Sequence, residues 1–293
     1  MRYEKIFLIG NPIAGGGALK KIKKAEEILK LRGISVKTLL TKKQGDAEEF
    51  ARKIKEKYTD KVIVLAAGGD GTYNEVVNGL AFSPIPMAIL PMGTTSVLAK
   101  ELKIPNNMEK AVDIALNGNI QRIHLGRIKN KEKKRLFILM AGIGFDGLAV
   151  YNVNPENKKY LRKIAYILSG IKSLLKYNPN ELKIMDSEIK KAFTAVVCKA
   201  SCYGGSFKIA PDASLKKDCF YIFLSKTPSK IRFATQIIGV IFSFHLKMKM
   251  TDYFKSETLK ITGNAHVQID GDYFGKTPVE IEIAKNALNL VFP

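Results

Sequence analysis

The sequence predicts an α/β domain with a parallel sheet, followed by a second domain that is mainly β and sandwich-like. Three observations support this prediction. In the first part of the chain, apolar segments of strand length alternate with segments of helical period, which is typical of βαβ units. After His124, short strand-like segments dominate instead. The chain has 293 residues, which is enough for about two domains with cores of their own.

The elements of the first domain alternate along the chain. Each predicted strand ends in small or polar residues, and the carboxyl ends of parallel strands meet at one edge of a sheet, so we expect the following loops to converge on one site. Helices are expected on both faces of this sheet. The predicted strands are residues 6–9, 34–40, 62–65 and 87–90, and the predicted helices are residues 18–33, 45–58, 75–80 and 97–102.

The strongest local signal is the glycine turn GGDGT at residues 68–72, between a buried strand and a helix. Three glycines let the main chain turn sharply and let a polyanion approach, and the N–H groups at a helix start favour negative charge. Phosphate is the expected ligand. Because Asp70 would repel a bare phosphate, we expect it to hold a divalent cation together with the phosphates. The alternative is an ordinary strand-to-helix turn in which Asp70 caps the helix.

Residues 11–17, NPIAGGG, form a second candidate loop for a phosphate or the edge of a ribose, again at the end of a strand. No Gly-Lys-Ser/Thr follows, so the loop is not a Walker A sequence. By itself this loop is a weak signal, because many such turns bind nothing.

The second part of the chain is predicted to be a β domain with two interruptions. Residues 157–177 form a basic helix candidate that contains aromatic residues, and residues 231–250 are strongly apolar. Charged and polar side chains in the latter argue against a membrane span, which leaves packing on the β domain or a position in a bilayer interface. The predicted strands are residues 121–128, 135–140, 182–185, 192–199, 219–225, 258–262, 266–270 and 279–283.

Composition restricts the partners and the compartment. The formal charge of +21 fits nucleic acid, an anionic membrane or nucleotide phosphates, and a lysine-rich surface also suits a thermophile. No RNA-binding aromatic signature, helix-turn-helix pattern or zinc finger accompanies it, so we expect no nucleic acid partner. The three cysteines are expected to be buried free thiols. The first residues lead directly into a strand without a signal peptide, so a cytoplasmic location is expected.

Six blocks in order give the chain a resemblance to a known family. They are NPIAGGG, GGDGTYNEVVNG, LPMGTTSVLAKEL, AGIGFD, YGGSFKIAPDASLKKD and QIDGDYFGKTP. The chain resembles the diacylglycerol kinase catalytic-domain family, the soluble bacterial lipid kinases, which are related to sphingosine kinases and more distantly to NAD kinases. The resemblance implies ATP-dependent phosphorylation of a lipid hydroxyl, most simply diacylglycerol to phosphatidic acid, in a cleft between the two domains. It also implies a nucleotide-binding domain at 1–122, a lipid-substrate domain at 123–285, and a last strand at 286–293 that returns to the first domain.

The resemblance also assigns site residues by position. The general base is an acid in the block Asp270-Gly271-Asp272, where Asp272 replaces the usual glutamate and is one methylene shorter. A structural Mg²⁺ is implied at Asp218 with the main-chain carbonyls of Leu215 and Phe220, an oxygen set that suits a hard cation. The residues implied to line the nucleotide site are Asn11, Thr41, Gly68, Gly69, Asp70, Gly71, Thr72, Tyr73, Asn74, Glu75 and Thr94.

This chain departs from the family pattern at several positions. Ser96-Val97 replaces the Asn-Asp that many relatives carry, which could alter contacts to adenine or ribose. His124 replaces an aspartate that often precedes Leu-Gly, which removes a possible member of the acidic metal network. We otherwise expect His124 to be structural.

The resulting hypothesis is that ATP·Mg²⁺ binds at the strand-end loops, with Asp70 as metal ligand and Asp272 as the base that deprotonates the lipid. Peripheral contact with an anionic membrane is expected through basic residues, or these form a merely solvated helix face. An NAD kinase-like enzyme and a non-catalytic nucleotide- or lipid-binding protein are the alternatives, and a homodimer is a further possibility. The candidate membrane residues are Lys158, Lys159, Arg162, Lys163 and Lys172.

Overall fold

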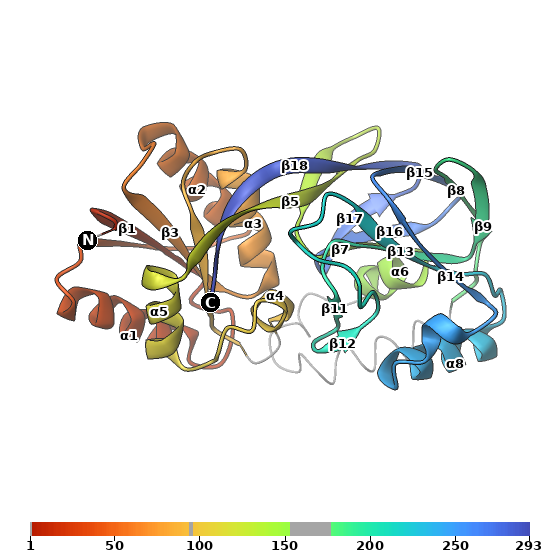
Figure 1. Ribbon diagram of the computed structural model, residues 1–293, viewed down its shortest axis with the longest axis horizontal. Helices are drawn as coiled ribbons and strands as arrows, with labels where there is room; N and C mark the ends of the chain where they lie inside the picture. The colour runs from red at the N-terminus through yellow and green to blue at the C-terminus, as the bar shows by residue number, and fades with distance from the viewer. Residues whose placement is uncertain (1, 94–95, 153–176) are drawn as a thin grey trace.

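The computed structural model describes residues 2–93, 96–152 and 177–293, and these form two bodies that lie side by side (Figure 1). The N-terminal body contains a parallel sheet covered by helices. The C-terminal body contains most of the remaining strands. Two long strands, β5 (Asn119–Lys129) and β18 (Val279–Phe292), run from one body into the other.

The parallel sheet of the first body has the strand order β2-β1-β3-β4. The helix α1 contacts α5, while α2 contacts α3, so the helices form two layers. Every residue of β3 is buried, which explains its continuous apolar sequence. The strands are β1 (Lys5–Gly10), β2 (Val36–Leu40), β3 (Val62–Gly68) and β4 (Met87–Pro91), and the helices are α1 (Ala18–Leu31), α2 (Asp46–Lys57), α3 (Asp70–Leu80), α4 (Val97–Glu101) and α5 (Met108–Asn117).

This strand order creates a switch point between β1 and β3. The chain moves from β1 to β2 on one side and then crosses back to β3 on the other, so the loops after β1 and β3 separate at the carboxyl edge. Gly10 is paired with Leu40 on one side and with Ala67 on the other, which aligns the ends of these strands. Ligands of open α/β sheets bind at such a crevice.

The second body is a sandwich of two sheets with an apolar core between them. In the described part of the chain, one layer is the distal half of a ten-stranded sheet, and the other is a six-stranded antiparallel sheet in the order β14-β13-β10-β7-β16-β17. Phe137 and Phe220 stack across the core with ring centroids 5.8 Å apart. The distal strands are β6 (Lys134–Phe137), β8 (Leu182–Met185), β9 (Ile189–Ala192) and β15 (Thr258–Thr262), and the second sheet contains β7 (Met140–Ile143), β10 (Thr194–Cys198), β13 (Phe220–Ser225), β14 (Thr251–Ser256), β16 (His266–Ile269) and β17 (Asp272–Lys276).

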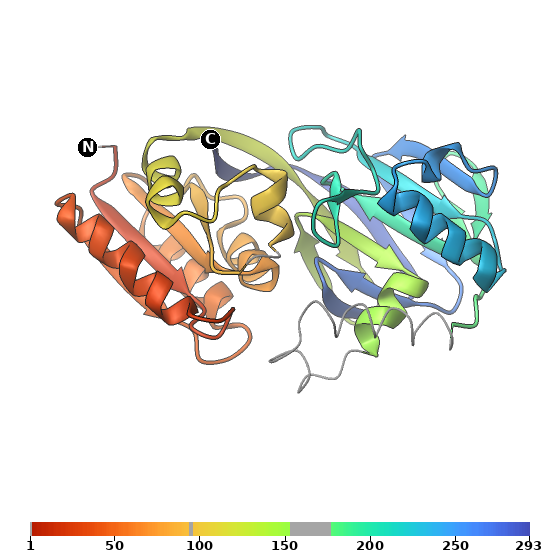
Figure 2. The same ribbon diagram turned by 90° about the horizontal axis from the view of Figure 1, so that it is seen from below.

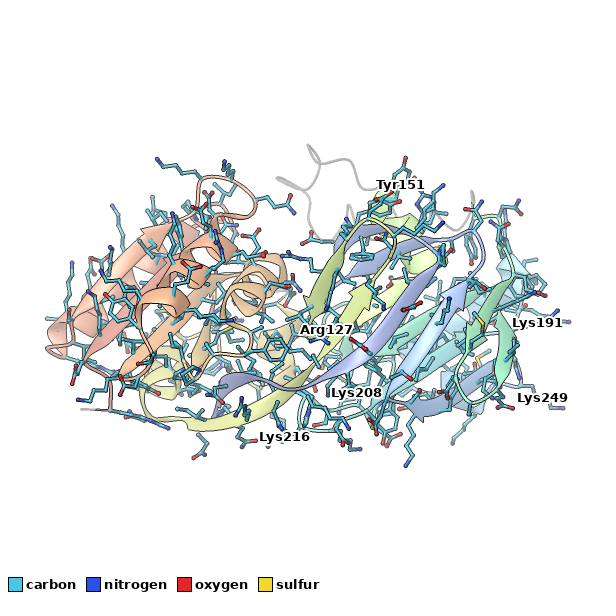
Figure 3. The ribbon with its side chains drawn as sticks, turned by 90° about the horizontal axis from the view of Figure 1, so that it is seen from above. Arg127, Tyr151, Lys191, Lys208, Lys216 and Lys249 are labelled. Carbon is cyan, nitrogen blue, oxygen red and sulfur yellow. The ribbon has the colours of Figure 1, made fainter. Side chains whose placement is uncertain are left out.

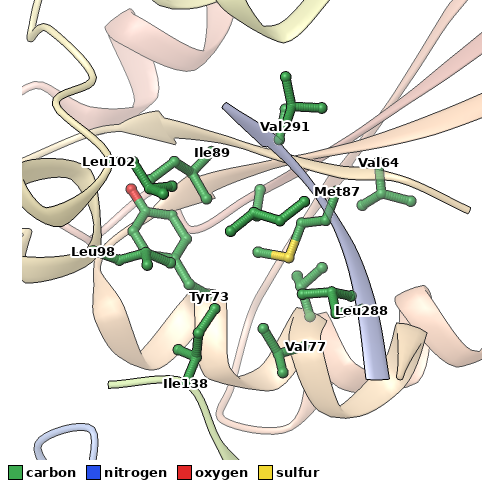
Figure 4. Close-up of a cluster of buried hydrophobic side chains, with 14 of the residues drawn as sticks. Val64, Tyr73, Val77, Met87, Ile89, Leu98, Leu102, Ile138, Leu288 and Val291 are labelled. Carbon is green, nitrogen blue, oxygen red and sulfur yellow. The ribbon is translucent and has the colours of Figure 1, made fainter. Parts of the chain in front are cut away.

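The strand β18 contributes to both cores. Its first part pairs with β15, and Leu290 near its end pairs in parallel with Met87 of β4. Leu288 and Val291 lie there near Met87, in the same buried cluster as Tyr73 in the core of the first body (Figure 4). The domain limits at 122/123 and 285/286 stay predictions, and β5 and β18 cross them without a break.

Smaller elements complete the second body. The apolar segment predicted at 231–250 forms α8 (Lys230–Ile241) followed by a 3-10 helix (His245–Lys247). One face of α8 is buried, and Gln236 on that face accepts a hydrogen bond from Ser225 Oγ at 2.5 Å. None of the helices in the described ranges has both the length and the apolar character to cross a membrane. The remaining elements are α6 (Phe145–Tyr151) and the two-stranded ribbon of β11 (Cys202–Tyr203) and β12 (Phe207–Lys208).

Candidate active site

The glycine turn lies at the carboxyl edge of the parallel sheet, where β3 ends and α3 begins. A Cβ on Gly68 would lie 2.5 Å from Thr72 Cβ, so glycine is needed for α3 to start this close to β3. Gly69 has φ −116° and ψ −174°, and a Cβ placed on it would meet no atom of the described residues within 4 Å. The first position therefore serves packing, and the second leaves the turn open to a ligand.

An acid from the second body reaches this turn. The side chain of Asp272, the first residue of β17, places Oδ2 3.4 Å from the position of a Cβ on Gly71. Gly71 lies in the first turn of α3, directly after Asp70. The structure thus brings the two predicted catalytic segments, which lie about 200 residues apart in the sequence, to one place between the bodies.

Asp70 holds the start of a different helix. Its Oδ2 accepts a hydrogen bond from Val97 N at 3.0 Å, and its Oδ1 accepts one from Leu98 N at 3.0 Å. Asp70 therefore caps α4, whereas the alternative interpretation had it cap its own helix. Burial raises the pKa of Asp70, while these hydrogen bonds oppose the effect. A carboxylate has about four lone-pair directions, so these contacts are compatible with a metal, and this role stays a prediction.

Two further predicted residues frame the switch point. Asn11 N donates to Ala67 O at 2.9 Å, and Asn11 Nδ2 donates to Thr72 Oγ1 at 3.4 Å, which ties the loop after β1 to the glycine turn. Thr41 N donates to Gly10 O at 2.9 Å and so follows the end of β2. Thr94 lies outside the described residues.

The side chains that follow the glycine turn support the framework. Tyr73 is fully buried, and its hydroxyl donates to Gly68 O at 2.9 Å. Glu75 accepts hydrogen bonds from Gly45 N at 3.0 Å and Ala47 N at 3.1 Å, so it caps α2. We conclude that these two side chains hold the sheet and helices in place, and their assignment to the nucleotide site stays a prediction.

Asp270 is a key residue whose role the sequence did not reveal. Its buried carboxylate accepts three main-chain hydrogen bonds, from Ile138 N and Leu139 N at 2.8 Å each and from Met140 N at 3.0 Å. Asn74 Nδ2 of α3 donates to it at 2.8 Å. Asp270 therefore anchors the turn that carries Asp272 to both bodies. Burial raises its pKa to about 6, so the carboxyl group is charged at pH 7.

A second buried acid supports the same turn. Asp146 accepts hydrogen bonds from Tyr203 OH at 2.5 Å and from Gln268 Nε2 at 2.6 Å. Gln268 in turn accepts a hydrogen bond from Gly271 N at 2.8 Å. Burial raises the pKa of Asp146. Three of the six sequence blocks thus meet in one network behind Asp272.

The implied structural metal site has different neighbours from those expected. Leu215 O accepts a hydrogen bond from His124 N at 3.1 Å. The carboxylate of Asp218 lies 3.8 Å from Lys285 Nζ. Phe220 is the first residue of β13. Within the described ranges, no cluster of three or more His, Cys, Asp or Glu side chains could hold a metal ion.

The fold and site together define a two-domain enzyme of the kinase class, in which a glycine turn at the edge of a parallel sheet faces an acid from a β-sandwich. The diacylglycerol kinase catalytic domain matches residues 5–128, and the YegS C-terminal NAD kinase beta sandwich-like domain matches residues 140–292. The chain therefore belongs to the diacylglycerol kinase family. The predicted family and fold class are confirmed.

Individual relatives agree over nearly the whole chain. A diacylglycerol kinase of Bacillus subtilis is 30% identical over 98% of this chain and 95% of its own. One from Staphylococcus saprophyticus is 27% identical, covering 92% of this chain and 90% of its own. The crystal structure of a candidate diacylglycerol kinase from Bacillus anthracis superposes with a TM-score of 0.82 at 25% identity, covering 100% of this chain and 96% of that one.

Proposed function

We propose that this protein is an ATP-dependent lipid kinase that converts diacylglycerol to phosphatidic acid. The observation that carries the proposal is the position of Asp272 over Gly71, because it brings a carboxylate that could act as a base beside a glycine-rich helix start of the kind that favours phosphate. The relatives named diacylglycerol kinase support the choice of lipid.

In the proposed reaction, the triphosphate of ATP lies at the start of α3. There the glycines leave room for it, and the main-chain N–H groups donate hydrogen bonds to its oxygens. Asp70 would hold a Mg²⁺ that accompanies the triphosphate, and this ion would supply positive charge to the transferring group. Asp272 accepts the proton of the lipid hydroxyl. The hydroxyl oxygen then forms a bond to the γ-phosphorus while the bond to the ADP oxygen breaks.

The rigid support of Asp272 compensates for its short side chain. A glutamate would reach one methylene farther, so an aspartate needs a fixed backbone at the correct distance. Asp270 has φ +49° and Gly271 has φ +89°, and the contacts of Asp270 and Gln268 hold this turn. Positioning of this kind supplies a large part of the catalysis of phosphoryl transfer.

Transfer of label from radioactive ATP to diacylglycerol, sphingosine and NAD tests the proposal. We expect labelled phosphatidic acid. Labelled NADP would instead support the NAD kinase alternative, and ATP binding without any product would support a non-catalytic protein. We expect Asp272→Asn to lower kcat by roughly 10²–10⁴ with ATP affinity retained. Asp272→Glu, which keeps the carboxylate, is the matched control and should retain activity.

We also propose that α8 mediates peripheral contact with an anionic bilayer. The helix lies on the outer face of the second body (Figure 2), and its exposed apolar side chains include Ile231 at 79% and Phe242 at 72% exposure. Burial of such a side chain contributes about 1.5–3 kcal/mol, and a nearby lysine or arginine adds about 1 kcal/mol on an anionic surface. The exposed basic residues next to them are Lys230, Arg232, Lys247 and Lys249.

Charge alone does not identify this face, because lysines are distributed widely. Lys191 and Lys249 lie at the end of the second body farthest from the first, whereas Lys216 lies near the junction of the two bodies (Figure 3). The combination of exposed apolar and basic residues on α8 is what favours a membrane surface. The basic residues between 158 and 172 that were predicted to contact the membrane lie outside the described residues. The homodimer also stays a prediction, which light scattering can test by measuring the molar mass in solution.

Co-sedimentation with phosphatidylglycerol and phosphatidylcholine vesicles tests the membrane contact. We expect the double variant Ile231→Ser, Phe242→Ser to bind phosphatidylglycerol vesicles at least tenfold more weakly. The control Ile189→Ser, which changes a 68% exposed isoleucine on β9, should bind like wild type. Equal binding of all three proteins would remove α8 from the membrane face.

A further inference from the structure

A buried lysine lies inside the loop where the family resemblance implies a metal ion. Lys199 follows β10 and has 0% exposure. Its ammonium group donates hydrogen bonds to Ser214 O and Lys217 O, each at 2.6 Å. Both carbonyls belong to residues 209–219, the connection between β12 and β13, which also contains Leu215 and Asp218. A positive charge therefore already holds this loop together.

The surroundings of Lys199 are polar and partly acidic. Burial lowers its pKa to about 8, while Cys219, Asp218 and Glu101 act in the opposite direction. The amine is therefore mostly protonated at pH 7. A buried charge of this kind is tolerated when its hydrogen bonds are made, and the two short contacts to carbonyls satisfy that condition.

The expected oxygen ligands do not fit Mg²⁺ in this arrangement. Mg²⁺ requires near-octahedral oxygen ligands and is usually held by one or two carboxylates. Asp218 is the single carboxylate in the implied set, its side chain is 59% exposed, and Lys285 Nζ lies 3.8 Å away, so its charge already has a cation as partner. Leu215 O accepts a hydrogen bond from His124 N, which leaves it one lone pair. An added divalent ion would meet repulsion from both lysines.

The residue that replaces the family's aspartate strengthens this conclusion. Burial and the charges of Lys199 and Lys285 lower the pKa of His124. Its Nδ1 accepts a hydrogen bond from Asn286 N at 3.2 Å. A histidine at this position supplies no negative charge in place of the family's aspartate. The loop does not need one, because the ammonium group of Lys199 already provides its positive charge.

We infer that the Lys199 ammonium group is the permanent cation of the loop at 209–219 and replaces the divalent ion implied there, so that this loop binds no metal. The inference goes beyond the proposed function, since it holds whatever the substrate is. One consequence is that the Mg²⁺ requirement of this protein is limited to the ion that accompanies the nucleotide.

Titration of the full-length, nucleotide-free protein with MnCl₂, followed by the electron paramagnetic resonance signal of free Mn²⁺, tests the inference directly. We expect Asp218→Asn to leave the number of bound Mn²⁺ ions and their affinity unchanged. Loss of one bound ion in Asp218→Asn would overturn the inference. Because any ion held by Asp70 remains in both proteins, this comparison is independent of the proposed function.

Thermal unfolding gives a second measurement that needs no variant. A structural ion present at 100 times its Kd would raise Tm by roughly 5 °C. We expect EDTA and 5 mM MgCl₂ to give the same Tm for nucleotide-free wild type. A fall of several degrees in EDTA that is absent in Asp218→Asn would contradict the inference.

A gain-of-site variant completes the test. The double change Lys199→Ala, His124→Asp removes the ammonium group and adds a carboxylate, and we expect it to gain one Mn²⁺ site and a Tm that rises with Mg²⁺. Lys199→Ala alone leaves two buried carbonyls without their donor and should have a lower Tm that Mg²⁺ does not restore. Should either variant fail to fold, the wild-type and Asp218→Asn measurements decide the question.

Discussion

Adjacent glycines in the turn after β3 have different structural requirements. A methyl group on Gly68 would overlap Thr72, whereas one on Gly69 would have room. We expect Gly68→Ala to lower the free energy of unfolding by about 1–3 kcal/mol, because α3 must shift to accept the methyl group. Gly69→Ala should leave stability within about 0.5 kcal/mol and weaken ATP binding, because its methyl group would occupy the phosphate approach. Urea denaturation and calorimetric titration with a non-hydrolysable ATP analogue measure both effects.

The opposite pattern would show that the ligand approaches elsewhere. If Gly69→Ala bound ATP normally, the phosphates could not lie over this residue. If Gly68→Ala were as stable as wild type, the start of α3 would have to be more adaptable than its close contact with Thr72 indicates.

The buried acid Asp270 gives a pH dependence of known sign. Its pKa is raised to about 6 in the folded protein, against about 4 in the unfolded chain, so the folded state binds more protons between these values. The contribution of Asp270 to stability is therefore complete well below pH 4 and declines by roughly 3 kcal/mol in total as the pH rises through 6. We expect the stability advantage of wild type over Asp270→Asn to shrink by this amount between about pH 3 and about pH 7, and to be constant above that range. An advantage that grows with pH would mean that the hydrogen bonds outweigh burial.

The site residues that could be predicted from the sequence are those whose neighbours in the sequence form a recognisable motif. The glycine turn and the block around Asp272 each carry their signal within a few neighbouring positions. The partners of Asp70 and Lys199 come from segments that only the fold brings close, such as Val97 and Lys217. Side chains that join distant segments leave no periodic pattern, so their roles could not be predicted.

At the scale of single elements, the predicted strand at 135–140 is wrong in one respect, because it is two strands, β6 and β7. The break has a physical cause. The N–H groups of Ile138 and Leu139 donate to Asp270 and so do not take part in a strand ladder. The local β propensity correctly predicted the strands on both sides of residues 138–139. The break between them is imposed by the carboxylate of Asp270, which is distant in the sequence. The helix α5 was missed, and the helix predicted at 75–80 begins earlier, at Asp70.

Glu75 provides a prediction at this scale, because it acts on α2 and not on its own helix. We expect Glu75→Ala to lower the free energy of unfolding by about 1–2 kcal/mol, since the N–H groups of Gly45 and Ala47 lose their acceptor. The KM for ATP should stay unchanged. Glu49→Ala, which removes an exposed pair with Lys53 on the same helix, is the control and should cost about 0.5 kcal/mol or less. A large rise in KM with unchanged stability would return Glu75 to the nucleotide site.

For the whole molecule, composition and element order were sufficient to predict two domains of different class. They were not sufficient to show how the domains are joined. β5 and β18 pair along their length with a bulge between Ala284 and Leu288, and they connect residues more than 150 positions apart. Strand pairing between residues so far apart in the sequence depends on the complete fold. A domain boundary placed where the local sequence pattern changes therefore cuts through the continuous strands β5 and β18.

These shared strands predict that the two bodies unfold together. Loss of the first body would expose the apolar end of β18, and loss of the second would remove the strand that covers β4, so neither body keeps its core without the other. Within the described residues, most helical positions lie in the first body, while the buried thiols of Cys198 and Cys202 lie in the second. Far-ultraviolet circular dichroism and thiol reactivity should therefore give one common urea midpoint.

The variant Leu290→Ala extends this test. Leu290 is fully buried and pairs with Met87, so its truncation should cost about 2–5 kcal/mol. If the bodies are coupled, the helix signal and the thiol signal shift to lower urea by the same amount, although the mutation lies in the first body. A shift of the helix signal alone, with the cysteines protected to the wild-type midpoint, would mean that the sandwich is stable by itself and that β5 and β18 only connect two independent units.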